Sequence, residues 1–128
     1  MRVLLDTHVF LWWVEGERAL PAKAHAAIAD RENECLISLV SAWELAIKVK
    51  LGKLKLALPV QRYLVEHAAA NGFQVLDIRL AHIGRVETLA AHHGDPFDRL
   101  LIAQALEEKL PIVTADPVFR KYGVKRIW

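Results

Sequence analysis

The chain has 128 residues, of which 54% are hydrophobic and 25% charged, and its formal net charge is +2. This composition predicts one globular domain spanning residues 1–128 and excludes a disordered or fibrous chain. An internal disulfide is excluded because Cys35 is the only cysteine, and so small a net charge does not by itself identify a nucleic-acid binder.

Short apolar runs alternate with longer helical patterns along the chain. The apolar runs predict strands at residues 3–6, 35–38, 73–76, 110–114 and, as a short last strand, 124–127. The helical patterns cover residues 9–14, 21–31, 41–50, 59–71, 80–93 and 95–109. We expect Glu15-Gly16-Glu17 to end the first helix and Gly72 to cap the fourth, whereas Gly84 is unfavourable inside the fifth. Residues 51–58 alternate apolar and basic side chains, a pattern that an edge strand would also show.

Strands that are separated by helices predict a parallel sheet. We therefore expect an α/β protein with three layers, α/β/α, around a central parallel sheet of four to five strands. No apolar stretch approaches the roughly 20 residues that span a bilayer. The first residues also lack the long apolar region of a signal peptide. We accordingly expect a cytoplasmic protein without a membrane partner.

Four acidic residues that are remote in sequence lie at predicted strand or helix ends: Asp6, Glu44, Asp98 and Asp116. In a parallel α/β sheet, the carboxyl ends of strands and the helix starts beside them border one crevice. A carboxylate cluster there repels itself unless protons or a divalent cation neutralise it. Oxygen ligands suit Mg²⁺ or Mn²⁺ and disfavour zinc. The pattern thus predicts a metal site that hydrolyses a phosphate ester.

Each acid also has a structural interpretation. Ser41 and Glu44 match a capping box, and Asp95 is placed to cap a helix whose first turn holds Asp98. Asp116 precedes a proline, as is common in turns. These roles are compatible with metal binding, because helix starts moderate the repulsion between carboxylates. The structural interpretation fits Asp6 least well, since it follows an apolar strand and enters an apolar helix.

The neighbours of these acids have open roles. The hydroxyls of Thr7 and Thr114 are expected to bond either the carboxylates or nearby backbone. His8, His92 and His93 are more commonly structural, and adjacent histidines face different ways on a helix. Two basic groups either hold phosphates or are solvated. They comprise Lys48, Lys50, Lys53 and Lys55 in the first and Arg120, Lys121, Lys125 and Arg126 in the second.

The segments that carry the acids resemble the PIN-domain ribonucleases, specifically the VapC-like toxins of type II toxin–antitoxin modules. The matching residues are Leu4 to His8, Ser41 to Glu44, Asp95 to Ala105, Val113 to Asp116 and Tyr122 to Trp128. The resemblance implies a Mg²⁺- or Mn²⁺-dependent endoribonuclease that acts on RNA, is held inactive by a cognate antitoxin protein and forms a homodimer. The metal chemistry argued above predicts hydrolysis by in-line attack of water, which leaves 5′-phosphate and 3′-hydroxyl ends.

The same resemblance assigns roles to individual residues. Asp6 and Asp98 would be the firmest metal ligands, and Glu44 and Asp116 would complete the catalytic acidic cluster. Asp95 would support the site from a helix cap, and Arg99 would orient a carboxylate or contact RNA.

Two other functions remain open at this point. One is a non-catalytic RNA-binding or regulatory module, against which the four acids argue because binding gains little from an anionic cleft. The other is a DNA-directed, flap-type nuclease, for which the chain has little room. The apolar run from Phe10 to Val14 either packs in the core or lines a groove for an antitoxin segment.

Overall fold

A single parallel sheet of five strands forms the centre of the protein in the computed structural model, which describes residues 1–16 and 18–128. The strands follow the order β3-β2-β1-β4-β5 across the sheet. Their bounds are β1 Arg2–Leu5, β2 Glu34–Ser38, β3 Gln74–Leu76, β4 Ile112–Val113 and β5 Arg126–Ile127. The predicted α/β fold with a parallel sheet is therefore confirmed.

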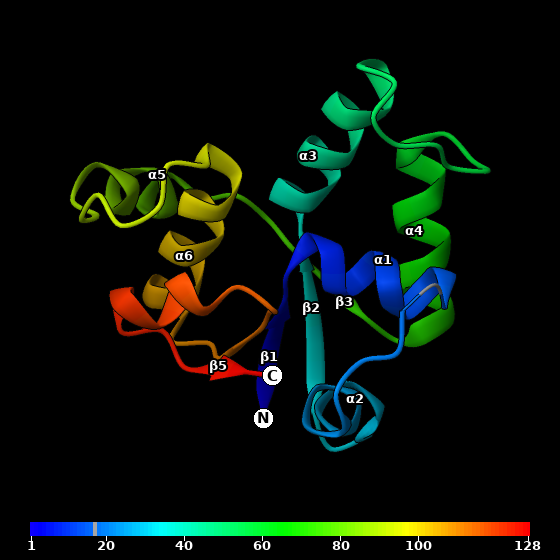
Figure 1. The fold of residues 1–128 in the computed structure, drawn as a ribbon, viewed down its shortest axis with the longest axis horizontal. Helices are drawn as coiled ribbons and strands as arrows, with labels where there is room; N and C mark the ends of the chain where they lie inside the picture. Colours follow the sequence, from blue (N-terminus) through cyan, green and yellow to red (C-terminus); the bar gives the residue numbers. More distant parts are fainter. Residues whose placement is uncertain (17) are drawn as a thin grey trace.

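Helices connect the strands and cover both faces of the sheet (Figure 1). They are α1 Thr7–Glu15, α2 Ala22–Ala29, α3 Leu39–Lys50, α4 Val60–Asn71, α5 Leu80–Glu87, α6 Pro96–Glu108 and the 3₁₀ helix η1 Pro117–Tyr122. Gly16 and Gly72 end α1 and α4 with φ of 67° and 69°, a left-handed conformation that favours glycine. Glu17, expected to share in ending the first helix, lies outside the described residues.

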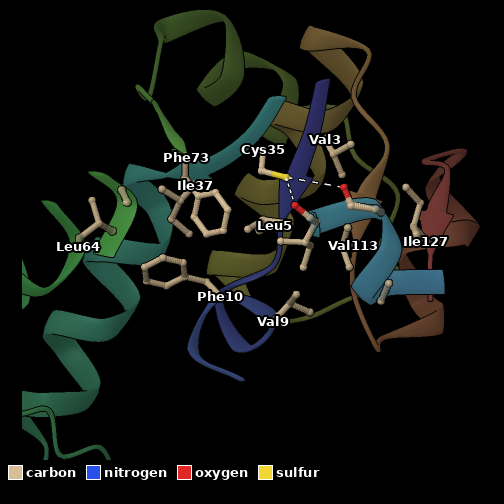
Figure 2. Packing of buried hydrophobic residues seen from close by; sticks show 14 of the residues in the cluster. Val3, Leu5, Val9, Phe10, Cys35, Ile37, Leu64, Phe73, Val113 and Ile127 are labelled. Carbon is tan, nitrogen blue, oxygen red and sulfur yellow. Dashed lines mark hydrogen bonds between the residues drawn. The ribbon is translucent and has the colours of Figure 1, made fainter. Parts of the chain in front are cut away.

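Alternation along β1 places its side chains in two separate cores. Val3 and Leu5 face the core formed with α1, α2 and α4, where Phe10 is fully buried (Figure 2). Leu4 faces the opposite core, which is formed mainly with α6 and η1. Cys35 lies in the first core with 3% of its surface exposed, and burial raises the pKa of its thiol to about 11. This buried thiol is structural rather than reactive.

Several elements differ from the predicted ones. The fifth helix ends at Glu87 rather than residue 93, so the segment 88–95 that follows is irregular. The third helix begins at Leu39 because the hydroxyl of Ser38, not that of Ser41, accepts the capping bond from the Val40 N–H at 3.0 Å. Residues 51–58 are turns and irregular backbone, not an edge strand. The 3₁₀ helix η1 had no counterpart among the predicted elements.

The strand order creates a topological switch between β1 and β4. The chain moves from β1 outward through β2 and β3 and then returns to β4 on the other side of β1. In open α/β sheets, ligands bind outside the carboxyl ends of the strands at such a point. Asp6 follows β1 directly and its N–H donates to the Val113 carbonyl at 3.0 Å, while Thr114 to Asp116 follow β4. In the described part of the chain, no helix has the length and apolar character needed to cross a membrane.

Candidate metal centre

Asp6 is buried at the carboxyl end of β1, with 6% of its surface exposed. It occupies the cap position of α1, but its side chain makes no capping bond. The hydroxyl of Thr114 donates to Oδ2 of Asp6 at 2.7 Å, and Oδ1 is buried without a hydrogen-bond partner among the described residues. Burial raises the pKa of the Asp6 carboxyl; the Thr114 hydrogen bond and His8 act in the opposite direction. The carboxylate is thus not used for capping.

Glu44 approaches the same site from α3 and has 3% of its surface exposed. Its Oε2 accepts a hydrogen bond from Lys48 Nζ at 2.6 Å, one helical turn further along. Its Oε1 is the second buried side-chain oxygen that lacks a partner within the described ranges. The capping box predicted for Ser41 and Glu44 is wrong, because the Ser41 hydroxyl instead bonds the Thr7 hydroxyl at 2.7 Å. Oε1 of Glu44 is therefore available for another role.

Asp98 and Asp116 are joined by a histidine. Nε2 of His93 lies 3.0 Å from Oδ2 of Asp98 and 2.8 Å from Oδ2 of Asp116. One ligand atom from each of the three residues falls within 4.8 Å of the others, so this group could hold a metal ion. Oδ1 of Asp116 accepts from the Val118 N–H at 2.9 Å and caps η1. Asp116 therefore has a structural role and a role in the cluster at the same time.

The pKa of Asp98 reports how closely the acids gather. Burial, followed by the charges of Asp6, Asp95, Glu44 and Asp116, raises this pKa to about 8. The four acids predicted from sequence are therefore brought to one place by β1, α3, α6 and the segment after β4. A carboxyl group with so high a pKa is under strong repulsion when it is ionised without a cation.

Among the supporting residues predicted from sequence, one bonds a carboxylate of the cluster directly and others fix the helices that carry the acids. Thr114 bonds the Asp6 carboxylate, whereas the Thr7 hydroxyl ties α1 to α3 through Ser41. Asp95 caps α6 as expected: its Oδ1 accepts from the N–H groups of Phe97 at 2.8 Å and Asp98 at 3.0 Å. These bonds fix the turn from which Asp98 projects.

Arg99 does not bond a carboxylate in the described part of the chain. Its guanidinium donates to backbone carbonyls of the segment 88–95, including those of Ala90 at 3.0 Å and His93 at 3.1 Å. It therefore holds the histidine-bearing segment against α6. Arg126 acts similarly, donating to the carbonyls of Thr114 at 3.0 Å and Ala115 at 2.7 Å.

His93 is the residue of the cluster that sequence reasoning did not select. The helical pattern through residue 93 suggested that adjacent histidines would face different ways. The structure ends α5 at Glu87, and the backbone of segment 88–95 turns the His93 ring toward the acids while His92 is exposed beside Tyr122. The signal available was Gly94 and Asp95, which mark a turn directly after His93.

The residues present fit a divalent cation. Oδ1 of Asp6 and Oε1 of Glu44 are buried and have no hydrogen-bond partner among the residues that the structure describes, which is costly unless a cation meets them. The donor set is mainly carboxylate oxygen, which suits a hard cation. This set of oxygen ligands exists only in the folded chain, because its members come from segments that are remote in sequence.

Comparisons with known proteins agree with this architecture. The family model of the PIN domain matches residues 3–125. Ribonuclease VapC22 of Mycobacterium tuberculosis is 32% identical over 123 residues, which cover 94% of this chain and 91% of that protein.

Solved structures show the same fold at low sequence identity. The structure of VapBC2 from Rickettsia felis bound to a promoter DNA fragment matches with a TM-score of 0.72 and 16% identity, and 100% of each chain is covered. FitAcB from Neisseria gonorrhoeae matches with a TM-score of 0.64 and 20% identity, over 98% of this chain and 96% of that one.

Proposed function

Because the chain belongs to the PIN-domain family, we propose that it is a toxin-type endoribonuclease that hydrolyses RNA phosphodiester bonds with Mg²⁺ or Mn²⁺. It acts in the cytoplasm as a single domain of residues 1–128 and is neutralised by a cognate antitoxin protein. The 32% identity to a ribonuclease over 94% of the chain supports the activity.

One observation carries the proposal. Four carboxylates from remote segments converge at the topological switch of the sheet, and two of them keep a buried oxygen without a partner in the described part of the chain. A purely structural cluster would pair these oxygens, since unpaired buried charges are costly. A non-catalytic binding module would have no need for this arrangement.

The side chains have distinct roles in the reaction. Asp6, Glu44, Asp98 and Asp116 would hold the cation, and the Thr114 hydroxyl fixes the orientation of Asp6. A bound divalent cation would lower the pKa of a water molecule and would offset negative charge on the phosphate and on the leaving 3′-oxygen. The carboxylates direct the water for in-line attack, and the products carry 5′-phosphate and 3′-hydroxyl ends.

An aromatic pair at the edge of the cluster suits a single-stranded substrate. Trp43 and Phe97 precede Glu44 and Asp98 in sequence, and their rings pack edge to face with centroids 4.8 Å apart. Half of the Trp43 surface is exposed. Stacking of a nucleobase on an aromatic ring contributes about 1–3 kcal/mol per base, so Trp43 is placed to hold a base next to the scissile phosphate.

The proposal is tested by RNA cleavage with purified protein in Mg²⁺, Mn²⁺ or EDTA, beside Asp98→Asn and Asp6→Asn prepared identically. We expect cleavage that requires the metal and is lost in both variants, while circular dichroism shows an unchanged fold. Sequencing of the product ends should find 5′-phosphates. Equal cleavage by the wild type and both variants would indicate a contaminating nuclease and contradict the assignment.

The antitoxin is proposed to bind beside α1. Trp12 and Trp13 are only partly buried, and a cavity of about 420 Å³ opens next to them, lined also by Arg18, Leu20 and His25. The guanidinium of Arg18 lies 4.3 Å from the Trp12 ring centroid. Tryptophan side chains in such positions are common anchors of protein interfaces. Hydrogen exchange of residues 9–14 should slow on addition of antitoxin, and unchanged exchange there would place the contact elsewhere.

We also propose that the protein is a homodimer. Leu80 and Ile83 on α5 expose 83% and 52% of their surfaces. Exposed apolar side chains of this kind are typical of a surface that a second copy of the chain covers. Sedimentation equilibrium should give twice the 14.5 kDa chain mass. The monomer mass for wild type would contradict this.

A further inference from the structure

We propose that His93 is a positioning residue of the metal centre: its Nε2–H group, hydrogen-bonded to Asp116 and 3.0 Å from Asp98, keeps these two carboxylates beside each other for a divalent cation. This inference rests on the proposed function, since it concerns the same site. It adds His93 to the four acids as a residue on which metal binding depends.

The hydrogen-bond pattern determines which ring nitrogen of His93 carries the proton. The backbone N–H of Asp95 donates to Nδ1 at 3.1 Å, so Nδ1 must present a lone pair. In the neutral ring the proton is then on Nε2. The Nε2–H group donates to Oδ2 of Asp116 at 2.8 Å, and Oδ2 of Asp98 lies 3.0 Å from the same nitrogen. His93 therefore serves Asp116 as a donor and lies directly beside Asp98.

The ring is fixed from several sides. The backbone N–H of His93 donates to the Tyr122 hydroxyl at 2.7 Å, and its carbonyl accepts from Arg99 at 3.1 Å. The ring packs edge to face on Phe119, which is fully buried, with centroids 6.2 Å apart. A donor held in this way loses little entropy when it orders its acceptors. The segment 88–95 thus presents Nε2 as a fixed point between the carboxylates.

The spacing that results matches a cation site. The ligand atoms of His93, Asp98 and Asp116 all lie within 4.8 Å of one another. Octahedral Mg²⁺ with bonds of about 2.1 Å separates its oxygen ligands by about 2.9 Å when adjacent and about 4.2 Å when opposite. Each carboxylate has two oxygens with about four lone-pair sites in total, so it can accept from Nε2 and still bind a cation.

Direct ligation by His93 agrees less well with the structure. It would require a lone pair on Nε2 and therefore a proton on Nδ1, where the Asp95 N–H already points. The change would set two N–H groups against each other and loosen the turn that carries Asp98. We therefore assign His93 to the hydrogen-bonded support of the ligands, where its loss is expected to weaken metal binding by about 10-fold to 100-fold.

The test measures Mn²⁺ binding to the full chain without RNA, by electron paramagnetic resonance of the free ion. The variants are His93→Leu, which removes the donor, and His93→Gln, whose amide N–H can reach the same position. His92→Ala is the matched control, because that exposed neighbour lies outside the cluster. We expect His93→Leu to weaken Mn²⁺ binding by about 10-fold or more, His93→Gln to restore most of the affinity, and His92→Ala to bind as the wild type does. Thermal unfolding in EDTA checks that each variant is folded.

Three results would overturn the inference. They are wild-type affinity in His93→Leu, equal loss in the Gln and Leu variants, and strong coupling of bound Mn²⁺ to a ring nitrogen, which would make His93 a ligand. These outcomes differ from failure of the proposed function, in which the wild type itself would neither bind Mn²⁺ nor cleave RNA.

Discussion

A carboxylate has two oxygen atoms, so a structural role for one leaves the other available. Asp116 caps η1 with Oδ1 and meets His93 with Oδ2. Asp6 stands at a cap position but makes no capping bond. The structural and metal-binding interpretations of the acids are therefore not exclusive, and the bonds of individual atoms show which oxygens remain free.

The raised pKa of Asp98 predicts an inverted pH dependence for the metal-free protein. With a pKa of about 8 in the folded state and 3.8 as the ordinary value, folded Asp98 keeps a proton that the unfolded chain releases between these limits. Unfolding thus releases a proton, and stability falls as pH rises from about 4 to 8. We expect the melting temperature in EDTA to fall over this range more steeply for wild type than for Asp98→Asn.

Comparison with Asp98→Asn isolates this effect, because the two proteins differ at this residue alone. Parallel curves for wild type and variant would show that Asp98 is ionised throughout this range.

The Thr114 hydroxyl links two acids and predicts a second residue effect. It donates to Oδ2 of Asp6 at 2.7 Å and accepts from the N–H of Asp116 at 3.1 Å. Thr114→Val keeps the shape but removes both bonds, so we expect about a 10-fold loss or more of Mn²⁺ affinity. Thr114→Ser, which keeps the hydroxyl, should bind Mn²⁺ nearly as wild type does. Similar affinities for the Val and Ser variants would show that the hydroxyl does not support the site.

The relative position of Glu44 and Asp98 depends on how α3 and α6 are joined. Ser38 begins α3, and its hydroxyl donates to Oε1 of Gln104 on α6 at 2.5 Å while accepting from the Val40 N–H. Both Ser38 and Gln104 are fully buried. This contact connects the helix that carries Glu44 to the helix that carries Asp98, so the relative position of the acids is set inside the core.

Removing this contact should destabilise the protein measurably. Ser38→Ala loses a helix cap, worth about 1 kcal/mol, and leaves the Gln104 carbonyl unpaired in the core, at a cost of about 1–3 kcal/mol. We expect the free energy of unfolding to fall by roughly 2–3 kcal/mol in urea titrations with EDTA present. Thr88→Ala, at an exposed hydroxyl, is the control and should change it by less than about 0.5 kcal/mol. Equal values for Ser38→Ala and wild type would mean that the pair is replaced by other bonds.

The fold as a whole brings like charges together, so a cation should stabilise it. A ligand that binds only the folded state stabilises it by about 1.4 kcal/mol at ten times its dissociation constant. For a domain of this size we expect Mn²⁺ to raise the melting temperature by roughly 3–7 °C. Asp6→Asn should show little of this rise and, in EDTA, should be at least as stable as wild type because one buried charge is removed. An equal rise in both proteins would indicate binding away from the acids.

Local sequence pattern determined most of the fold. Apolar runs and helical patterns correctly predicted the strands β1 to β5 and the α-helices between them, though not η1, because side-chain periodicity reflects which faces are buried. Asp95 and Gly72 were correctly placed at helix ends, since capping depends on residues close in sequence. The four acids were also selected from sequence, because strand and helix ends in a parallel sheet share one edge.

Only the tertiary structure decided which atoms meet at that edge. His93 contacts Asp116 across 23 residues, Thr114 contacts Asp6 across 108, and Ser38 contacts Gln104 across 66. Such hydrogen bonds depend on how remote segments pack, which no local pattern encodes. The same holds for the early end of α5, which frees the segment 88–95 to turn His93 toward the acids. Sequence determined the chemistry available to this protein, and packing decided which oxygens stay unpaired, because burial removes the water that would otherwise pair them.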